Sequence, residues 1–288
     1  HMADAVLYDP NKVPGAREQD IVDMVFREFG QLHNWRAMFS AHWEEVAELV
    51  LPTSRNTFFF GAYNTPGIKK TDRQMDPSAT LALTRFGAIL DSLLTPRNML
   101  WHTLEATNPD VQKDRQVRLW FEEVSRLMFK MRYAPLANFS SQNQQNYQSL
   151  GAFGNAAMFI DQLDGRQYHG AIGLRYKAMP IGEMFFRENH QGLVDGFIRW
   201  FRLNAHQAHT QFKGNLPPQI QSAYEARSEQ LFDFYHWVGP REDFDPDRLD
   251  ERGKPWASYY VSATCRCLMS EGGYNSFPVA VSRYDQAP

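Results

Sequence analysis

The stretch Ile181–Leu203, IGEMFFRENHQGLVDGFIRWFRL, decides how the second half of this chain folds. At its centre, Asn189-His190-Gln191-Gly192 has the composition of a turn, because Asn and Gly both tolerate positive φ. The flanks EMFFRE and LVDGFIRWFRL are rich in aromatic and β-branched residues, which favour strands. The stretch therefore predicts a β-hairpin with Asn189 and Gly192 at its tip.

The same stretch also holds acidic and imidazole side chains that could form an acid/base site, namely Glu183, Glu188, His190 and Asp195. Two carboxylates that act as acid and base need a cleft and two different environments. In a hairpin, Glu188 instead stands where an arginine can pair with it, and Asp195 can pair with Arg187 or Arg199. The pattern favours ion pairing over chemistry.

The composition of the 288 residues is that of a folded protein, with 43% apolar and 22% charged residues. Aromatic residues reach 14%, which favours large buried cores and an assembly partner. The formal net charge is −3 and no long run of Lys or Arg occurs. This argues against a protein that wraps nucleic acid electrostatically, but it leaves room for a surface along which DNA slides.

The two cysteines, Cys265 and Cys267, stand as Cys-Arg-Cys within an expected strand. No second Cys or His pair completes a zinc set, so buried reduced thiols and a cytosolic environment are favoured over a metal site. The longest apolar run, residues 81–94, contains Arg85 and Asp91. We therefore expect no membrane-spanning segment.

The first half of the chain predicts mainly helices. Residues 1–15 form a loose arm that includes a tag remnant, His1-Met2. An apolar stripe with steps of three and four runs from Ile21 to Val50, and Pro52 ends this helix. A helix capped by Asp76 or Ser78, one over about 111–132 and a polar one within 136–153 follow.

The helix expected at about 111–132 has an apolar face, and we expect that face to be buried. Its members are Val117, Trp120, Phe121, Val124, Leu127, Met128 and Met131.

After Gly154 the pattern changes to strands, expected within 155–163, 173–181, 231–238, 257–269 and 277–284. Short helices interrupt them at about 204–213 and within 217–230. The sequence thus predicts an α+β fold, with a helical part over 16–150 and a β-rich part over 151–288.

No phosphate loop, dinucleotide turn, nucleophile elbow or His-Glu-x-x-His pair occurs, so no cofactor is expected. The nearest metal pattern is His206-Gln207-Ala208-His209, which places both rings on one helical face. A metal-dependent hydrolase using His206 and His209 with a nearby carboxylate is one interpretation, and solvated or packing histidines are the other. The segment 58–74 has the Gly- and Pro-containing composition of a loop, and it includes Lys69, Lys70 and Arg73. Contact with a DNA backbone, contact with a neighbouring subunit and exposure to solvent are the three interpretations of these basic residues.

The segment 182–212, GEMFFRENHQGLVDGFIRWFRLNAHQAHTQF, resembles the portal, or head-to-tail connector, proteins of T7-like short-tailed bacteriophages (podoviruses). The matching residues are Gly182, Glu183, Phe185, Asn189, Gly192, Val194, Asp195, Arg199, Gln207 and Phe212. Segments 43–52, 76–104, 151–161 and 277–284 also resemble the family, so the similarity spreads over about 20–284. His102 and Lys213 depart from the family's pattern.

The resemblance implies a ring, typically dodecameric, at one vertex of the phage head, through which double-stranded DNA is packaged and ejected. It implies docking of the terminase large subunit, then of tail adaptor proteins, and contacts with capsid and scaffolding proteins. The location would be the virion, or the host cytoplasm during assembly, without membrane or enzymatic activity. The alternative within phage biology is a scaffold protein that makes no channel.

Members of the resembled family are substantially longer than this chain. The matched portion looks like the peripheral wing, so we expect the stem, the clip and the crown to lie mostly beyond Pro288. We also expect the fragment alone to be monomeric.

Overall fold

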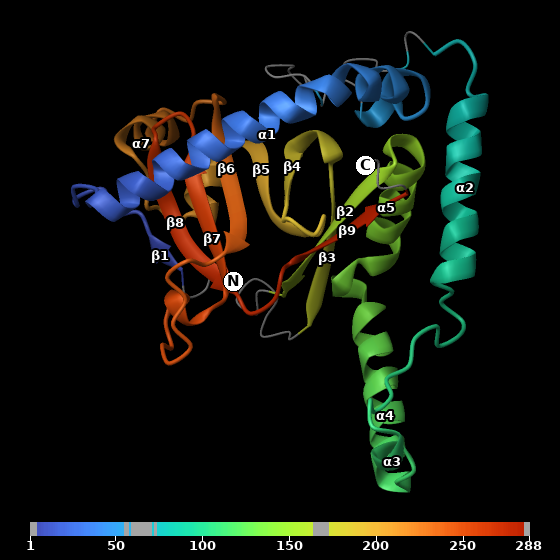
Figure 1. Ribbon diagram of the computed structural model, residues 1–288. Coiled ribbons are helices and arrows are strands. Elements are labelled where there is room, and N and C mark those ends of the chain that lie inside the picture. Colours follow the sequence, from blue (N-terminus) through green and yellow to red (C-terminus); the bar gives the residue numbers. More distant parts are fainter. Residues whose placement is uncertain (1–4, 55–57, 59–70, 72–73, 164–172, 285–288) are drawn as a thin grey trace. The chain divides into compact units, whose positions relative to one another are not determined.

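The computed structural model describes residues 5–54, 58, 71, 74–163 and 173–284 (Figure 1). They form two compact units, and each unit combines segments from both sides of residue 150. Unit 1 comprises His1–Glu44, Asn56–Asn64 and Ile181–Pro278, and unit 2 comprises Glu45–Arg55, Thr65–Pro180 and Val279–Pro288. Helices dominate the N-terminal half and antiparallel strands the C-terminal half, so the predicted α+β class is confirmed.

Unit 1 contains a six-stranded antiparallel sheet in the order β1-β8-β7-β6-β5-β4. The helix α1 (Ala16–Leu49) begins in this unit and crosses one face of the sheet (Figure 1). The other face is covered by α6 (Ala205–Gln211) and α7 (Pro218–Glu225). The strands are β1 (Val6–Leu7), β4 (Met184–Glu188), β5 (Val194–Asn204), β6 (Leu231–Pro240), β7 (Trp256–Ser262) and β8 (Cys267–Tyr274).

Strand alternation explains why both faces of this sheet are apolar. Ile198 of β5 faces α1, whereas Phe201 of the same strand faces the α6–α7 side. On the α1 side, Ile21, Val25 and Phe29 are buried as the stripe predicts, and Phe29 stacks on Tyr235 of β6 at 4.3 Å between ring centroids.

The apolar stripe of α1 is buried only along its first turns. Trp35 and Phe39, in the middle of the helix, are 55% and 39% exposed, so the stripe is not one continuous buried face.

Unit 2 contains a three-stranded antiparallel sheet in the order β3-β2-β9. The helix α5 (Phe139–Phe153) packs on β2 and β3, and α2 (Ser78–Leu94) packs on α5. A Cβ added at Gly87 of α2 would lie 3.4 Å from Cγ of Gln148, so the small residue lets the two helices approach closely. The strands are β2 (Asn155–Gln162), β3 (Leu174–Met179) and β9 (Val279–Arg283).

The helix expected at about 111–132 is divided into α3 (Pro109–Gln112) and α4 (Arg115–Arg132). Asp114 caps α4, because its carboxylate accepts from the backbone N–H of Gln116 at 2.8 Å. One side of α4 contacts the preceding extended segment, where Ser125 Oγ accepts from the N–H of Leu104 at 2.9 Å. The predicted burial is wrong for three residues on another side of the helix, Trp120, Leu127 and Met128, which are 58%, 55% and 37% exposed.

The strand expected over 257–269 is also wrong, because a turn interrupts it between β7 and β8. Ser262 Oγ accepts from the N–H of Cys265, and Arg266 adopts a positive φ of 49°. Cys265 and Cys267 are free and half-buried. Burial raises the pKa of Cys267 to about 12, so its thiol stays protonated at neutral pH.

The described residues also include four short 3₁₀ helices, namely η1 (Pro52–Ser54), η2 (Pro135–Ala137), η3 (Ile181–Glu183) and η4 (Glu251–Gly253). Within the described ranges, no helix is both long and apolar enough to cross a membrane.

Candidate functional site

The predicted hairpin is confirmed, with β4 and β5 paired and the turn at Asn189–Gly192. The Asn189 side-chain oxygen accepts from the backbone N–H groups of Gln191 and Leu193, at 2.9 and 3.0 Å. Gly192 has a φ of 74°, a conformation in which a side chain is strained. The tip is therefore fixed by turn chemistry that is local in the sequence.

One arginine ties this hairpin to α1. Arg187 Nε lies 3.0 Å from Asp195 Oδ1, as predicted, and Arg187 Nη1 lies 3.2 Å from Glu28 Oε1 of α1. The second oxygen of Glu28 accepts from Trp237 Nε1 of β6 at 2.7 Å. Glu28 thus holds helix and sheet together through both of its oxygens.

A second arginine, Arg36 of α1, supports the segment that precedes the hairpin. It is 5% exposed, and its Nη1 donates to the carbonyl oxygens of Ile181, Gly182 and Met184 at 3.3, 2.8 and 3.1 Å. Its guanidinium carbon lies 3.7 Å from the ring centroid of Phe185. Burial lowers the pKa of Arg36 to about 10, so the group is still a cation at neutral pH. Carbonyl dipoles and the aromatic face offset the cost of burying that charge.

Two further residues of the resembled segment, Glu183 and Gln207, also make structural contacts. Glu183 pairs with Arg199 at 2.8 Å across the hairpin. Gln207 belongs to a capping box at the start of α6, in which its N–H donates to Asn204 and its side-chain oxygen accepts from the Asn204 N–H. The carboxylates Glu183 and Asp195 therefore belong to separate ion pairs rather than to one acid/base set.

The residues predicted for a metal site face an aromatic ring. His206 and His209 of α6 both stack on Tyr224 of α7, with ring centroids 6.1 and 4.1 Å away. In the described part of the chain, no group of three His, Cys, Asp or Glu side chains is placed to hold a metal ion. This geometry favours the interpretation of His206 and His209 as packing histidines.

The predicted DNA-contact residues, Lys69, Lys70 and Arg73, lie outside the described residues.

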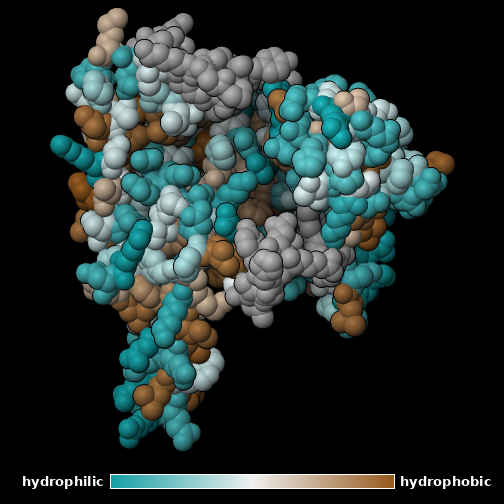
Figure 2. Space-filling view, turned by 180° about the vertical axis from the view of Figure 1, so that it is seen from behind, coloured by the Kyte–Doolittle hydropathy of each residue, from teal (hydrophilic) through white to brown (hydrophobic). Residues whose placement is uncertain are grey.

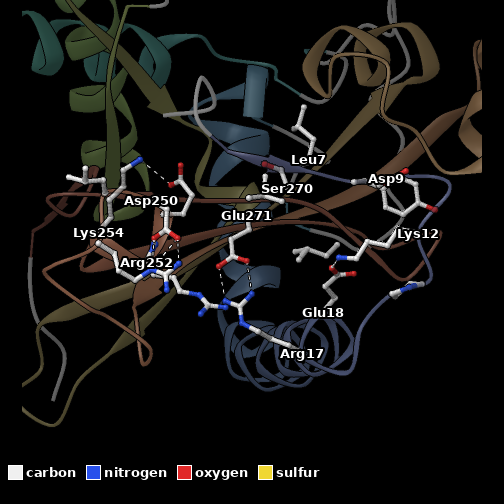
Figure 3. A pocket seen from close by; sticks show the side chains of 17 residues that line it. Leu7, Asp9, Lys12, Arg17, Glu18, Asp250, Arg252, Lys254, Ser270 and Glu271 are labelled. Carbon is white, nitrogen blue, oxygen red and sulfur yellow. Dashed lines mark hydrogen bonds and ion pairs between the residues drawn. The ribbon is translucent and has the colours of Figure 1, made fainter.

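A second polar cluster surrounds a cavity of about 490 Å³ next to β1 and β8 (Figure 3). Arg17, from the first turn of α1, points at Glu271 of β8 and forms two bonds to its carboxylate, at 2.7 and 2.8 Å. Fully buried Arg241 Nη1 donates to the same carboxylate at 2.9 Å. Burial raises the pKa of Glu271, but the bonds from Arg17 and Arg241 outweigh burial and hold that pKa below its ordinary value.

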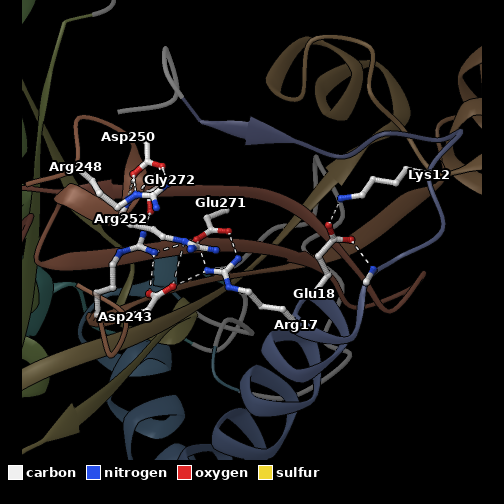
Figure 4. A network of polar contacts seen from close by, with 11 residues as sticks. Lys12, Arg17, Glu18, Asp243, Arg248, Asp250, Arg252, Glu271 and Gly272 are labelled. Atoms are coloured by element: carbon white, nitrogen blue, oxygen red, sulfur yellow. Dashed lines mark hydrogen bonds and ion pairs between the residues drawn. The ribbon is translucent and has the colours of Figure 1, made fainter. Parts of the chain in front are cut away.

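The network continues beyond Glu271 (Figure 4). Asp243 pairs with Arg17 at 3.1 Å and with Arg252 at 3.4 Å, and Arg248 pairs with Asp250. Through Arg17, this network fastens the start of α1 to the sheet. The charged groups named here are paired with one another, so the cavity offers a structural network rather than a poised nucleophile or base.

The comparisons with known proteins agree with this structural character. A family model described as "Bacteriophage head to tail connecting protein" matches residues 24–288.

The chain belongs to the bacteriophage head-to-tail connecting protein family. It is 27% identical over 272 residues to the probable portal protein of Bordetella phage BPP-1, covering 93% of this chain and 47% of that protein. It is 25% identical over 271 residues to the portal protein of Salmonella phage epsilon15, covering 91% of this chain and 46% of that protein. The chain thus spans about half the length of these two relatives.

Arg36, Glu28 and Arg17 were not singled out from the sequence, although they hold α1 against the sheet. Each lies on the expected helix and each is a charged residue among many. Their partners lie more than 140 residues away along the chain, so local spacing carried no signal for them.

Proposed function

We propose that this protein is a structural portal subunit, which assembles into a ring at one vertex of a phage head. The channel of the ring would pass double-stranded DNA inward during packaging and outward during ejection. The match of the family model to residues 24–288 carries this proposal. The ion pairs of Glu183 and Asp195 support a structural role for the resembled segment rather than an enzymatic one.

The proposed partners follow from the same role. The full-length product would assemble with itself as a dodecamer and dock the terminase large subunit, then tail adaptor proteins, and it would contact capsid and scaffolding proteins. It would reside in the virion after assembly in the host cytoplasm. The net charge of −3 is compatible with a conduit, since tight binding to phosphates would slow the sliding of DNA.

Negative-stain electron microscopy of the purified full-length product tests this proposal. A portal gives closed rings with a central hole when viewed end-on. Particles that remain monomeric at every concentration, or that grow into open filaments, contradict it and favour a scaffold protein without a channel.

For the DNA contacts, we retain the proposal that Lys69, Lys70 and Arg73 approach the phosphate backbone. Replacing all three with Ala should lower the DNA content of assembled phage particles while rings still form. The control replaces two exposed basic residues elsewhere, Arg27 and Arg97, with Ala. An undiminished DNA content in the triple variant rejects the role of these three residues.

A further inference from the structure

Unit 2 exposes two apolar helix faces that its described residues leave uncovered. On α2, the outward face carries Ala82, Phe86, Ile89 and Leu93, with steps of four, three and four residues. Phe86, Ile89 and Leu93 are 39%, 55% and 71% exposed. We call these four residues the α2 seam. This spacing is that of the a and d positions of a coiled coil.

A matching face runs along α4, and we call its five residues the α4 seam: Val117, Trp120, Val124, Leu127 and Met131. Their steps of three, four, three and four residues repeat the same pattern. Trp120 and Leu127 are more than half exposed, and the other three are half-buried. Figure 2 shows apolar side chains among polar ones on the projection that contains α4, at the lower left.

Most of the two seams lies apart from the faces that stabilise unit 2 itself, although the ring of Phe86, at the edge of the α2 seam, also lies against Gly151 of α5. The helix α2 packs on α5 through its other side, where Leu83 and Gly87 are buried. The helix α4 contacts the segment before it through Ser125 and through Phe129, whose ring stacks on His102. Exposed apolar stripes of this kind mark surfaces that another helix covers.

We infer that the α2 seam of one copy of this chain packs against the α4 seam of a neighbouring copy. The inference rests on the proposed portal function, because a ring joins each subunit to two neighbours through two unlike surfaces. The two seams lie on different helices and both have the spacing of a two-helix contact. A single self-complementary patch would close a two-fold dimer instead.

The flanking charges favour one arrangement of the two helices. Arg85 borders the α2 seam, whereas Glu123 and Lys130 border the α4 seam on the corresponding side. Within the described ranges, neither Arg85 nor Glu123 forms an ion pair. When the two helices run antiparallel, Arg85 lies on the same side of the contact as Glu123 and Lys130. Opposite charges favour the register in which Arg85 lies beside Glu123 and not beside Lys130. In that register, Phe86 lies opposite Trp120.

Photo-cross-linking tests this contact directly, because it measures which residues lie close together and does not depend on a change in folding. Phe86→p-benzoylphenylalanine keeps an aromatic side chain at the seam. Leu81→p-benzoylphenylalanine is the matched control, because Leu81 lies on α2 at 56% exposure but off the seam. The full-length product is prepared as an equal mixture of ¹⁴N- and ¹⁵N-labelled chains, and cross-linked peptides are identified by mass spectrometry.

The expected result is a cross-link from position 86 to α4, near Trp120. One of the two linked peptides should carry ¹⁴N and the other ¹⁵N, which shows that they come from two different chains. Position 81 should give at least about tenfold less of this product. Interchain cross-links from position 86 that fall outside α4, or assembled rings that give no interchain cross-link from this position, overturn the inference. Electron microscopy of the same sample separates the two proposals: rings with cross-links elsewhere reject only the seam contact, whereas a sample without rings rejects the portal function.

Association measurements provide an independent check. Leu127→Ser removes a seam side chain, and Leu119→Ser removes one of similar exposure from another side of α4. Leu127→Ser should weaken ring association about tenfold and Leu119→Ser should leave it unchanged, because only the seam becomes buried on assembly. Equal effects of the two variants contradict the inference.

Discussion

Glu28 of α1 accepts a hydrogen bond from Trp237 of β6 while its other oxygen pairs with Arg187 of β4, so one carboxylate joins a helix to two strands. Glu28→Leu removes both interactions and leaves the Trp237 N–H without this acceptor. We expect it to lower the free energy of unfolding by about 1–3 kcal/mol in urea denaturation. Glu28→Gln keeps an acceptor for Trp237 and should cost less. Equal losses in the two variants would show that the indole bond contributes nothing.

Arg36→Met should destabilise unit 1, because it removes the donor that serves the carbonyl oxygens of Ile181, Gly182 and Met184. Leaving buried acceptors without a donor costs about 1–3 kcal/mol, measured as a lower urea midpoint. The exposed Arg27→Met on the same helix is the control and should change stability little. A variant at Arg36 as stable as the control would contradict the role assigned to this residue.

Gly192→Val should destabilise the hairpin by about 1–3 kcal/mol through backbone strain, since the residue adopts a φ of 74°. Nothing lies within 4 Å of a Cβ placed there, so the cost comes from the backbone and not from a clash. Gly192→Asn should be tolerated much better, because Asn accepts a left-handed conformation. Thermal unfolding of both variants checks this, and similar melting temperatures for Val and Asn would reject the argument.

His236 should make the protein less stable in mild acid. Burial, aided by the nearby Arg199, holds the pKa of His236 well below its ordinary value of 6.5, and the ring lies 3.0 Å from Ser258 Oγ. Below pH 6.5 the His236 ring binds a proton in the unfolded chain but not in the folded chain. The free energy of unfolding therefore falls as the pH decreases. The expected slope from this residue is at most about 1.4 kcal/mol per pH unit.

Urea denaturation between pH 7 and pH 5 measures the contribution of His236. His236→Asn should flatten the slope, whereas the control His190→Asn, at an exposed turn position, should keep it. An unchanged slope in His236→Asn would mean that other groups cause the acid sensitivity.

The hairpin could be predicted because its determinants are local: turn residues at the tip and strand-forming residues on both sides. The interruption between β7 and β8 escaped prediction because the segment lacks Gly, Pro and Asn, and Arg266 takes the left-handed conformation that such residues usually adopt.

The apolar pattern of α4 gave the direction of its apolar side but not what covers it. An amphipathic sequence does not distinguish a core from an interface, so Trp120 and Leu127 were expected to be buried but lie exposed. Arg36 and Glu28 could not be found because their partners are distant in sequence and depend on the completed fold.

The pairing of β2 with β9 has a consequence for how the protein is made. Phe159 pairs with Val279, and strands β4 to β8 of unit 1 lie between these positions in the sequence. During synthesis, the sheet of unit 2 therefore cannot be completed until the ribosome has produced most of unit 1. Such long-range closure slows folding, and until β9 has been made the half-formed sheet presents an open edge of β2, which is prone to aggregation.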